Sequence, residues 1–187
     1  ALIGDALDDF GGSVVSSGRM THLLEDRVEM VPISFEMSYR AEDWAGVVRR
    51  VESGNRHGYV IKSADSFAGS RLAPDLGERM LSRELMIRAL AEQTLAIAKR
   101  ENVDAIHAYG GYEARPFIAA YVSALLDKPL ILTFSGQDLE RGVFGYGFSH
   151  IRQAVEHAAL ITCKSEKAAT IVGGLLGPSA QIRIIRN

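Results

Sequence analysis

Short apolar runs alternate with longer amphipathic stretches along the whole chain, and few folds accommodate that alternation. Runs this short have the length of buried strands, whereas the longer stretches carry apolar residues at helical spacing. We therefore predict an α/β fold, with a Rossmann-like parallel sheet of about seven strands and helices on both faces. The strand candidates are Leu2–Gly4, Val28–Ile33, Tyr59–Lys62, Val103–His107, Leu130–Phe134, Ala159–Cys163 and Ile182–Ile185.

The amphipathic stretches between these runs are the helix candidates. Two of them carry apolar stripes that we expect to face the sheet. One stripe holds Trp44, Val47, Val48 and Val51, and the other holds Phe117, Ile118, Tyr121, Val122 and Leu125. No linker or repeat interrupts the pattern, so we expect one Rossmann-like domain over residues 1–187. The expected helices are Ser13–Glu25, Glu42–Ser53, Arg79–Glu101, Arg115–Asp127, His150–His157 and Ser165–Leu176.

Composition restricts the class of partner. The 187 residues are 47% hydrophobic and 24% charged, which is enough for one sizeable core. The 21 basic and 23 acidic side chains give a net charge of -2. This balance does not favour a nucleic acid as the partner, and a small neutral or phosphorylated ligand fits better.

The single cysteine and the absence of long apolar segments bear on location. Cys163 is the only cysteine, so the chain has no intrachain disulfide and no cysteine-based metal site. No segment approaches the ~18 uninterrupted apolar residues of a membrane span, and no signal-peptide pattern opens the chain. We expect a cytoplasmic protein.

A glycine pair follows the first predicted strand. Gly11 and Gly12 stand just before a predicted helix, where backbone N–H groups and the helix dipole favour a phosphate. The sequence matches neither the dinucleotide fingerprint nor the P-loop. A tight turn with Ser13 capping the helix explains the same residues, so both interpretations stay open.

Polar residues also follow two later strands. His107, Tyr109 and Gly110 end one strand, and Ser135, Gly136 and Asp138 follow the next. Parallel α/β sheets bind ligands at the carboxyl ends of their strands. A hydroxyl and a carboxylate suit sugar hydroxyls, while a glycine permits close approach. A hydrogen-bonded structural histidine and a plain turn are the simpler alternatives.

In their order, these motifs resemble those of family 4 of the GT-B glycosyltransferases. Gly11-Gly12 resembles the family's glycine loop, Asp104–Ala108 its D-x-I-H-A strand and Thr133–Asp138 its T-x-H-G-x-D turn. Ala158–Glu166 resembles the strand that ends in Ser-Glu, and Ile182–Asn187 resembles the family's I-x-V-I-P-N. Many relatives have histidine at the positions of Tyr109 or Ser135, which leaves His107 as the histidine of these strand-end motifs.

The resemblance implies the N-terminal domain of a retaining enzyme that moves a hexosyl group from a nucleotide sugar to an acceptor. The donor would bind chiefly to a C-terminal domain absent from this chain, so the chain is expected to be inactive alone. The implied catalytic residues are His107 and Asp138. The residues implied to bind the acceptor are Tyr109, Ser135 and Gly136, and Gly11 and Gly12 would lie near the donor diphosphate.

The implied partners are a nucleotide sugar, a sugar or glycolipid acceptor, and the protein's own C-terminal domain. A glycolipid acceptor would bring the full-length protein to a membrane surface as a peripheral protein. Neither a metal nor any cofactor beyond the donor is expected. Two alternatives stay open: a GT-B protein resembling nucleotide-sugar epimerases, and a noncatalytic α/β module that binds a ligand.

Overall fold

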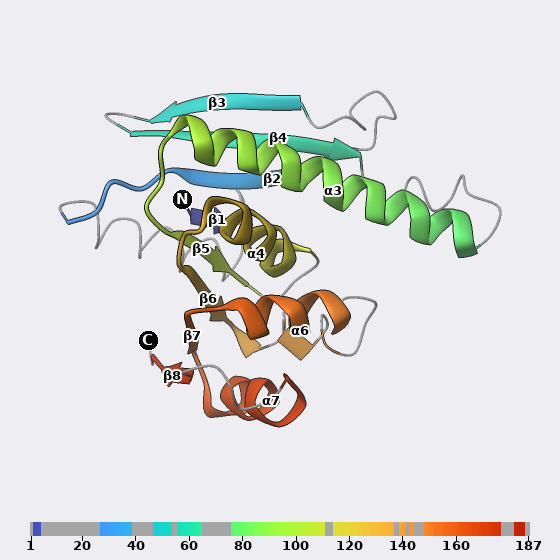
Figure 1. The fold of residues 1–187 in the computed structure, drawn as a ribbon, viewed down its shortest axis with the longest axis vertical. Helices are drawn as coiled ribbons and strands as arrows, with labels where there is room; N and C mark the ends of the chain where they lie inside the picture. The colour runs from blue at the N-terminus through green and yellow to red at the C-terminus, as the bar shows by residue number, and fades with distance from the viewer. Residues whose placement is uncertain are drawn as a thin grey trace.

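One sheet of eight strands runs through the part of the chain that the structure describes (Figure 1). This computed structural model describes residues 2–4, 27–38, 47–53, 56–64, 76–110, 114–136, 139–140, 143, 148–176 and 182–185. The strand order is β3-β4-β2-β1-β5-β6-β7-β8. The strands are β1 (Leu2–Gly4), β2 (Pro32–Ser38), β3 (Val47–Ser53), β4 (Arg56–Ala64), β5 (Ile106–Tyr109), β6 (Leu130–Phe134), β7 (Leu160–Cys163) and β8 (Ile182–Ile184).

Every neighbouring pair of strands is parallel except β3 and β4. The expected α/β class with a parallel sheet is therefore confirmed. From β1 the chain passes to β2 on one side, and it later returns to β5 on the other side. The sheet thus has its topological switch point between β1 and β5, where open α/β sheets bind ligands.

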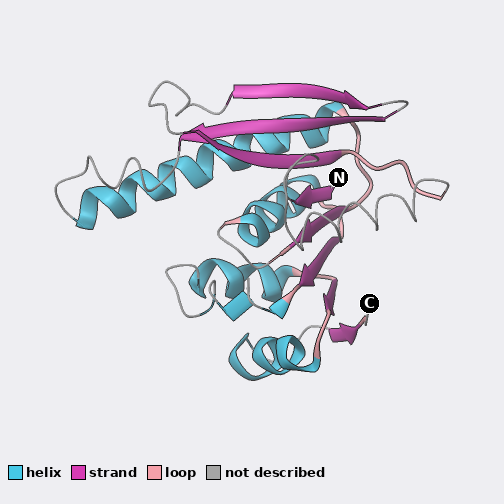
Figure 2. Cartoon of the chain, turned by 180° about the vertical axis from the view of Figure 1, so that it is seen from behind, coloured by secondary structure: helices cyan, strands magenta, loops and turns pink. Residues whose placement is uncertain are grey.

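The described helices form a layer on one face of the sheet (Figures 1 and 2). They are α3 (Leu76–Arg100), α4 (Arg115–Leu126), α6 (Phe148–His157) and α7 (Glu166–Leu176). From β4 through β8 each connection steps the same way along the sheet, and right-handed crossovers then put their helices on the same side. The predicted helix over 13–25 lies outside the described residues. Among those described, no helix is long and apolar enough to cross a membrane.

The segment Val47–Ser53 corrects one prediction, since it forms strand β3 and not the end of a helix. It pairs antiparallel with β4, from Val47 opposite Lys62 to Ser53 opposite Arg56. Valines at helical spacing are equally the residues that strands favour, and ladder hydrogen bonds to β4 decide between the two. This strand brings the sheet to eight, against about seven expected.

Strand β2 lies further along the chain than predicted. The prediction covered Val28–Ile33, but Val28 is 52% exposed and the strand runs from Pro32 to Ser38. Its second half, Ser34 to Ser38, alternates polar and apolar residues, and β4 pairs with it along its length. The mostly apolar segment Val28–Ile33, which Glu29 interrupts, was thus a poorer guide than the alternating segment that follows it.

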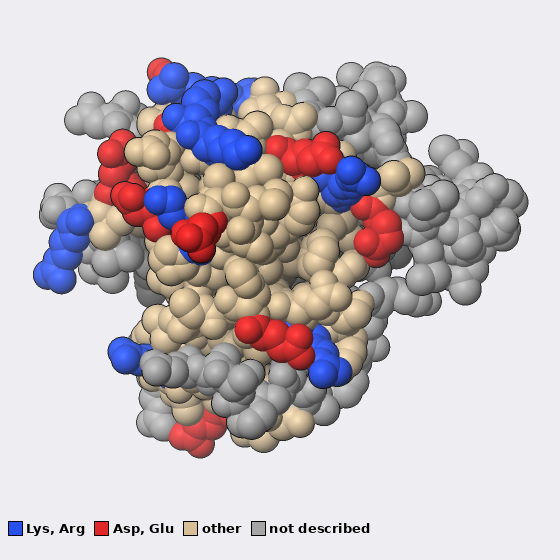
Figure 3. All heavy atoms as spheres, viewed as in Figure 1, with Lys and Arg blue, Asp and Glu red and all other residues tan. Residues whose placement is uncertain are grey.

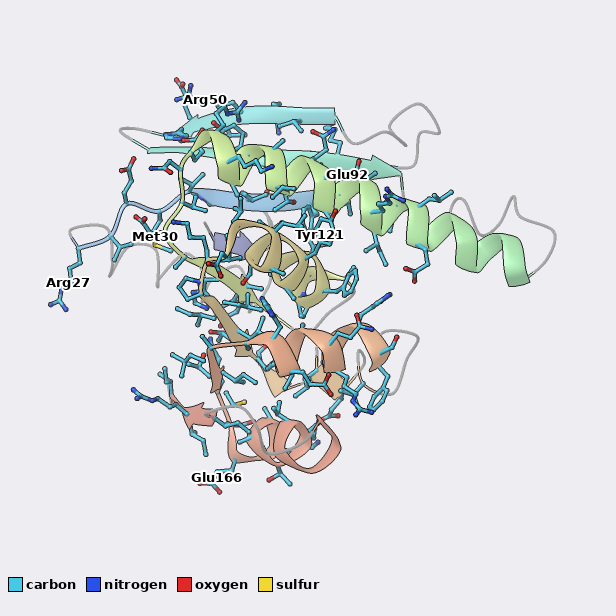
Figure 4. The ribbon with its side chains drawn as sticks, viewed as in Figure 1. Arg27, Met30, Arg50, Glu92, Tyr121 and Glu166 are labelled. Carbon is cyan, nitrogen blue, oxygen red and sulfur yellow. The ribbon has the colours of Figure 1, made fainter. Side chains whose placement is uncertain are left out.

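Helix α4 has nearly the predicted bounds, but only part of its apolar stripe faces the sheet. Ile118 and Val122 are fully buried and pack in the core that also contains Ile106 and Leu132. Tyr121 and Leu125 are instead 36% and 54% exposed, so the prediction that they face the sheet is wrong. Figure 4 shows Tyr121 on the outer side of α4, and Figure 3 shows a largely uncharged surface over this helix. Only one side of a wide apolar stripe can contact the sheet.

Candidate functional site

The two faces of β5, β6 and β7 differ in chemistry. On the face toward α4, the side chains Ile106, Ala108, Leu132, Phe134, Ile161 and Cys163 are all buried and apolar. Alternation along each strand places His107, Tyr109, Thr133 and Thr162 on the opposite face. We call these four residues the polar face. A parallel sheet is ordinarily apolar on both sides, so this polarity needs an explanation.

A chain of hydrogen bonds accounts for three members of the polar face. His107 Nε2 lies 2.7 Å from Thr133 Oγ1, which lies 2.6 Å from Thr162 Oγ1. The Thr162 hydroxyl donates to the Leu132 carbonyl at 3.4 Å. A carbonyl can only accept, so the chain is satisfied when each hydroxyl donates onward and a His107 Nε2–H donates to Thr133.

Burial keeps His107 neutral. Desolvation is the main cause that lowers the pKa of its imidazole to about 4. A general base works best with a pKa near the working pH, and the pKa of His107, about 4, lies well below neutral pH. Its hydrogen bond to Thr133 gives this histidine a structural role, so its catalytic role stays a prediction.

Tyr109, in contrast, has an unused polar group. It is the last residue of β5 and only 2% exposed, and its hydroxyl has no hydrogen-bond partner among the described residues. A buried hydroxyl without a partner costs about 1–3 kcal/mol, so such groups are rare and often mark functional positions. Lys164, which follows β7, places its Nζ 4.9 Å from the centre of the Tyr109 ring. This cation–π contact joins the ends of two strands that flank β6.

A second unpartnered hydroxyl lies in the same row of the sheet. Ser34 of β2 is 3% exposed, and its Oγ has no partner within the described part of the chain. Ser34 pairs with Gly4, and β1 pairs with β5 at Leu2–His107 and Ile3–Ala108. Continuing that register puts Gly4 beside Tyr109. Two hydroxyls without a partner among the described residues therefore flank a glycine at the switch point.

The turn after β6 supplies the other predicted residues. Ser135 and Gly136 directly follow β6 and lie at the same carboxyl edge as Tyr109. A Cβ on Gly136 would meet no heavy atom within 4 Å, so the space beside this glycine is open. Gly11, Gly12 and Asp138 lie outside the described residues, so their assignments remain predictions.

Lys164 is a site residue that the sequence-based prediction did not single out, whereas Gly110 was named at the end of its strand. Gly110 has a φ of 93°, which favours glycine, and its N–H donates to the Thr133 carbonyl at 2.8 Å. The signal for Lys164 was its place as the first polar residue after an apolar strand. Among the residues described, no group of three or more His, Cys, Asp or Glu side chains is placed to hold a metal ion.

Two solved structures resemble this chain over most of its length. Sucrose-phosphate synthase from Thermosynechococcus elongatus matches with a TM-score of 0.59 at 11% identity, over 100% of this chain and 87% of that one. Trehalose-6-phosphate synthase from E. coli, bound with UDP-2-fluoro glucose, matches with a TM-score of 0.59 at 9% identity. The fold is that of GT-B glycosyltransferases.

The resemblance to GT-B glycosyltransferases is one of structure. No family model and no curated protein matches the sequence. The match with the E. coli structure covers 90% of this chain but only 40% of the E. coli chain. The GT-B fold expected from the motifs is therefore confirmed, whereas the family 4 type stays a prediction.

Proposed function

We propose that this chain is the acceptor-side N-terminal domain of a retaining GT-B glycosyltransferase of the family 4 type. The observation that carries the proposal is the GT-B fold with two buried hydroxyls, those of Ser34 and Tyr109, that have no partner among the described residues and lie at the carboxyl edge of the sheet, beside the switch point. Tyr109, Ser135 and Gly136 would contact the acceptor there. A second Rossmann-like domain would bind the nucleotide-sugar donor, which fits the UDP-2-fluoro glucose bound by the E. coli neighbour.

The chemistry of the edge suits a sugar acceptor. Hydroxyl groups of Tyr109 and Ser135 both donate and accept, as sugar hydroxyls do, so reciprocal hydrogen bonds can form. The open space beside Gly136 allows a sugar ring to approach the backbone. Neutral His107 stiffens β5 and β6 beneath this position through Thr133. Gly11 and Gly12 would offer backbone donors to the leaving diphosphate, and Asp138 would act as a catalytic carboxylate.

The proposal is tested by comparing the full-length protein with the 187-residue chain, using UDP-glucose and a panel of sugar acceptors. We expect transfer by the full-length protein and none by the isolated chain, because transfer would also need the proposed donor-binding domain. A fully active isolated chain would contradict the two-domain assignment. A changed donor sugar without transfer would instead identify an epimerase, and binding without turnover would identify a noncatalytic module.

Gly136 offers a sharper variant within the full-length protein. Gly136→Val fills the open space beside the backbone, so the KM for the acceptor should rise about tenfold, equivalent to about 1.4 kcal/mol, while stability changes little. Gly174→Val is the matched control, because a Cβ at Gly174 also meets nothing within 4 Å but lies in α7. Equal effects of the two substitutions on KM would remove Gly136 from the acceptor site.

A further inference from the structure

We propose that strand β3 is a dimerisation edge, at which two copies of this protein join their sheets into one. The occupant of the edge is the β3 strand of a second copy, which runs antiparallel to the first about a two-fold axis beside Val51. This interface lies apart from the candidate site, because β3 is the edge of the sheet farther from β5 and β6.

Strand β3 has a free side among the described residues. It pairs with β4 on one side, and no described strand pairs with it on the other. No described helix extends beyond β3 in either view of the ribbon (Figures 1 and 2). Successive residues of an antiparallel strand direct their backbone groups alternately toward the neighbouring strand and away from it. Every second residue of β3 therefore presents an N–H and a C=O to which another strand can bond.

The shape of β3 does not prevent such pairing. Proteins protect an edge strand by making it short, by placing a proline or a bulge in it, or by adding charge. Strand β3 has seven residues without a proline, and three of them are valines, which favour strands. Its register with β4 runs without a bulge from Val47 opposite Lys62 to Ser53 opposite Arg56. Charge therefore decides which strand can pair with this edge.

The charges of β3 are exposed and of both signs. Arg50 and Glu52 extend from the same face, where Arg50 Nε lies 3.6 Å from Glu52 Oε1. Their side chains are 56% and 70% exposed, and Figure 4 shows Arg50 at the outer edge of the sheet. Arg49 lies on the other face, with its Nη2 4.0 Å from Glu36 Oε2. An incoming strand thus meets both a positive and a negative side chain on one face.

Two-fold symmetry selects one register for a second copy. In an antiparallel pair of identical strands, the residue at the two-fold axis lies opposite itself. When that residue is Val51, Arg50 lies opposite Glu52 of the second copy, and Glu52 lies opposite its Arg50. An axis at Arg49, Arg50 or Glu52 would place like charges directly opposite each other, which destabilises a sheet. The charges of β3 therefore complement a second copy in the register centred on Val51.

Sedimentation velocity of the full-length protein at low salt tests the interface, over concentrations from about 1 to about 100 μM. We expect the wild type to pass from monomer to dimer as the concentration rises. Arg50→Glu and Glu52→Arg should each raise the Kd of the dimer at least about tenfold, because symmetry places two pairs of like charges in the interface. The double variant should restore the wild-type Kd, since it exchanges the charges within the same register. A wild type that stays monomeric throughout would leave the edge to another partner and overturn the proposal.

The matched control is Arg88→Glu, which reverses an exposed arginine that pairs with Glu92 on α3 at 3.1 Å. It should leave the Kd of the dimer unchanged. Equal weakening by Arg88→Glu and Arg50→Glu would reduce the effect to net charge and overturn the proposal. A dimer that Arg50→Glu does not weaken would place the interface elsewhere. Thermal unfolding identifies misfolding of Arg50→Glu, in which case Arg50→Gln replaces it.

Disulfide formation tests the register. Val51→Cys places two cysteines opposite each other with their Cα atoms about 4.5–5.5 Å apart, a distance that a disulfide spans. The natural Cys163 is buried and does not compete. Mild oxidation of the full-length Val51→Cys variant should give a covalent dimer, whereas Arg88→Cys, at an exposed position on α3, should stay monomeric. Cross-linking of both variants, or of neither, would overturn the two-fold pairing at Val51.

Discussion

Replacing Glu101 with glutamine should destabilise the fold, because this carboxylate holds the end of α3 to β4. Glu101 directly follows α3, and its side chain is only 17% exposed. Its Oε1 accepts from the Tyr59 hydroxyl at 2.5 Å, and its Oε2 lies 2.9 Å from His57 Nε2. Arg100 also reaches Oε1, at 3.4 Å, and lies over the Tyr59 ring.

The size of the effect follows from these contacts. A hydrogen bond to a charged group contributes about 1.5–3 kcal/mol when buried, and the Tyr59 contact meets that condition because Tyr59 is 3% exposed. Arg100 is 58% exposed and contributes little. Glutamine keeps one acceptor oxygen but loses the charge, so we expect the free energy of unfolding to fall by about 2 kcal/mol. Alanine leaves the Tyr59 hydroxyl unpartnered and should cost about 3 kcal/mol.

The effect should depend on pH in a defined direction. The hydrogen bond from Tyr59, followed by that from His57, lowers the pKa of Glu101 below its ordinary value. Since the folded pKa is lower than the unfolded one, the carboxylate stabilises the fold fully above the ordinary glutamate range, near pH 4.5. This stabilisation is lost as the pH falls through the folded pKa. Wild type and Glu101→Gln should therefore converge in acid.

Urea unfolding of the wild type and Glu101→Gln at pH 7 and at acidic pH measures both effects. Glu92→Gln is the matched control, because it makes the same change in an exposed pair with Arg88 on α3 and should cost less than about 0.5 kcal/mol. In a protein that also carries Tyr59→Phe, Glu101→Gln should lower the free energy of unfolding by about half as much as it does in the wild type. The reasoning is refuted if Glu101→Gln costs no more than Glu92→Gln at pH 7.

Three further predictions concern single positions. Ser165→Ala should lower the free energy of unfolding by about 1 kcal/mol, because the Ala168 N–H donates to Ser165 Oγ at the start of α7; an unchanged urea midpoint would contradict this. Asp127→Gly should raise stability by about 0.5 kcal/mol, since Asp127 caps α4 at a φ of 52° where glycine is less strained; Asp127→Val should lower it. Cys163 should resist thiol reagents at pH 8 until urea unfolds the chain, because burial raises the pKa of its thiol to about 11; rapid labelling of the folded protein would contradict this.

Local signals in the sequence were sufficient for the half of the fold from β5 onward. Short apolar runs predicted β6, β7 and β8 to within one residue, because buried parallel strands carry little else. The strand predicted over Val103–His107 begins three residues too early, since β5 runs from Ile106 to Tyr109. Helical spacing predicted α3 and α4 close to their observed bounds. The helix predicted from Ser165 onward is observed as α7, and the Ala168 N–H donates to Ser165 Oγ at its start. Each of these features depends on residues close together in the chain.

Strand β3 could not be recognised from valine spacing, although another signal was present. Val47, Val48 and Val51 satisfy helical spacing as well as strand preference, and pairing with β4 decides the outcome. Ser53 pairs with Arg56, which leaves Gly54-Asn55 as a two-residue connection, a recognised hairpin signal.

The sequence by itself determined the α/β class and the edge of the sheet at which polar residues gather. The tertiary structure decided which polar groups are used there. A hydrogen bond to Thr133 occupies His107 and burial lowers the pKa of its imidazole, whereas the Tyr109 hydroxyl has no partner among the described residues and the Tyr109 ring contacts Lys164. Residues 55 positions apart meet in that last contact. Strand order sets such distances, and local sequence patterns carry no information about them.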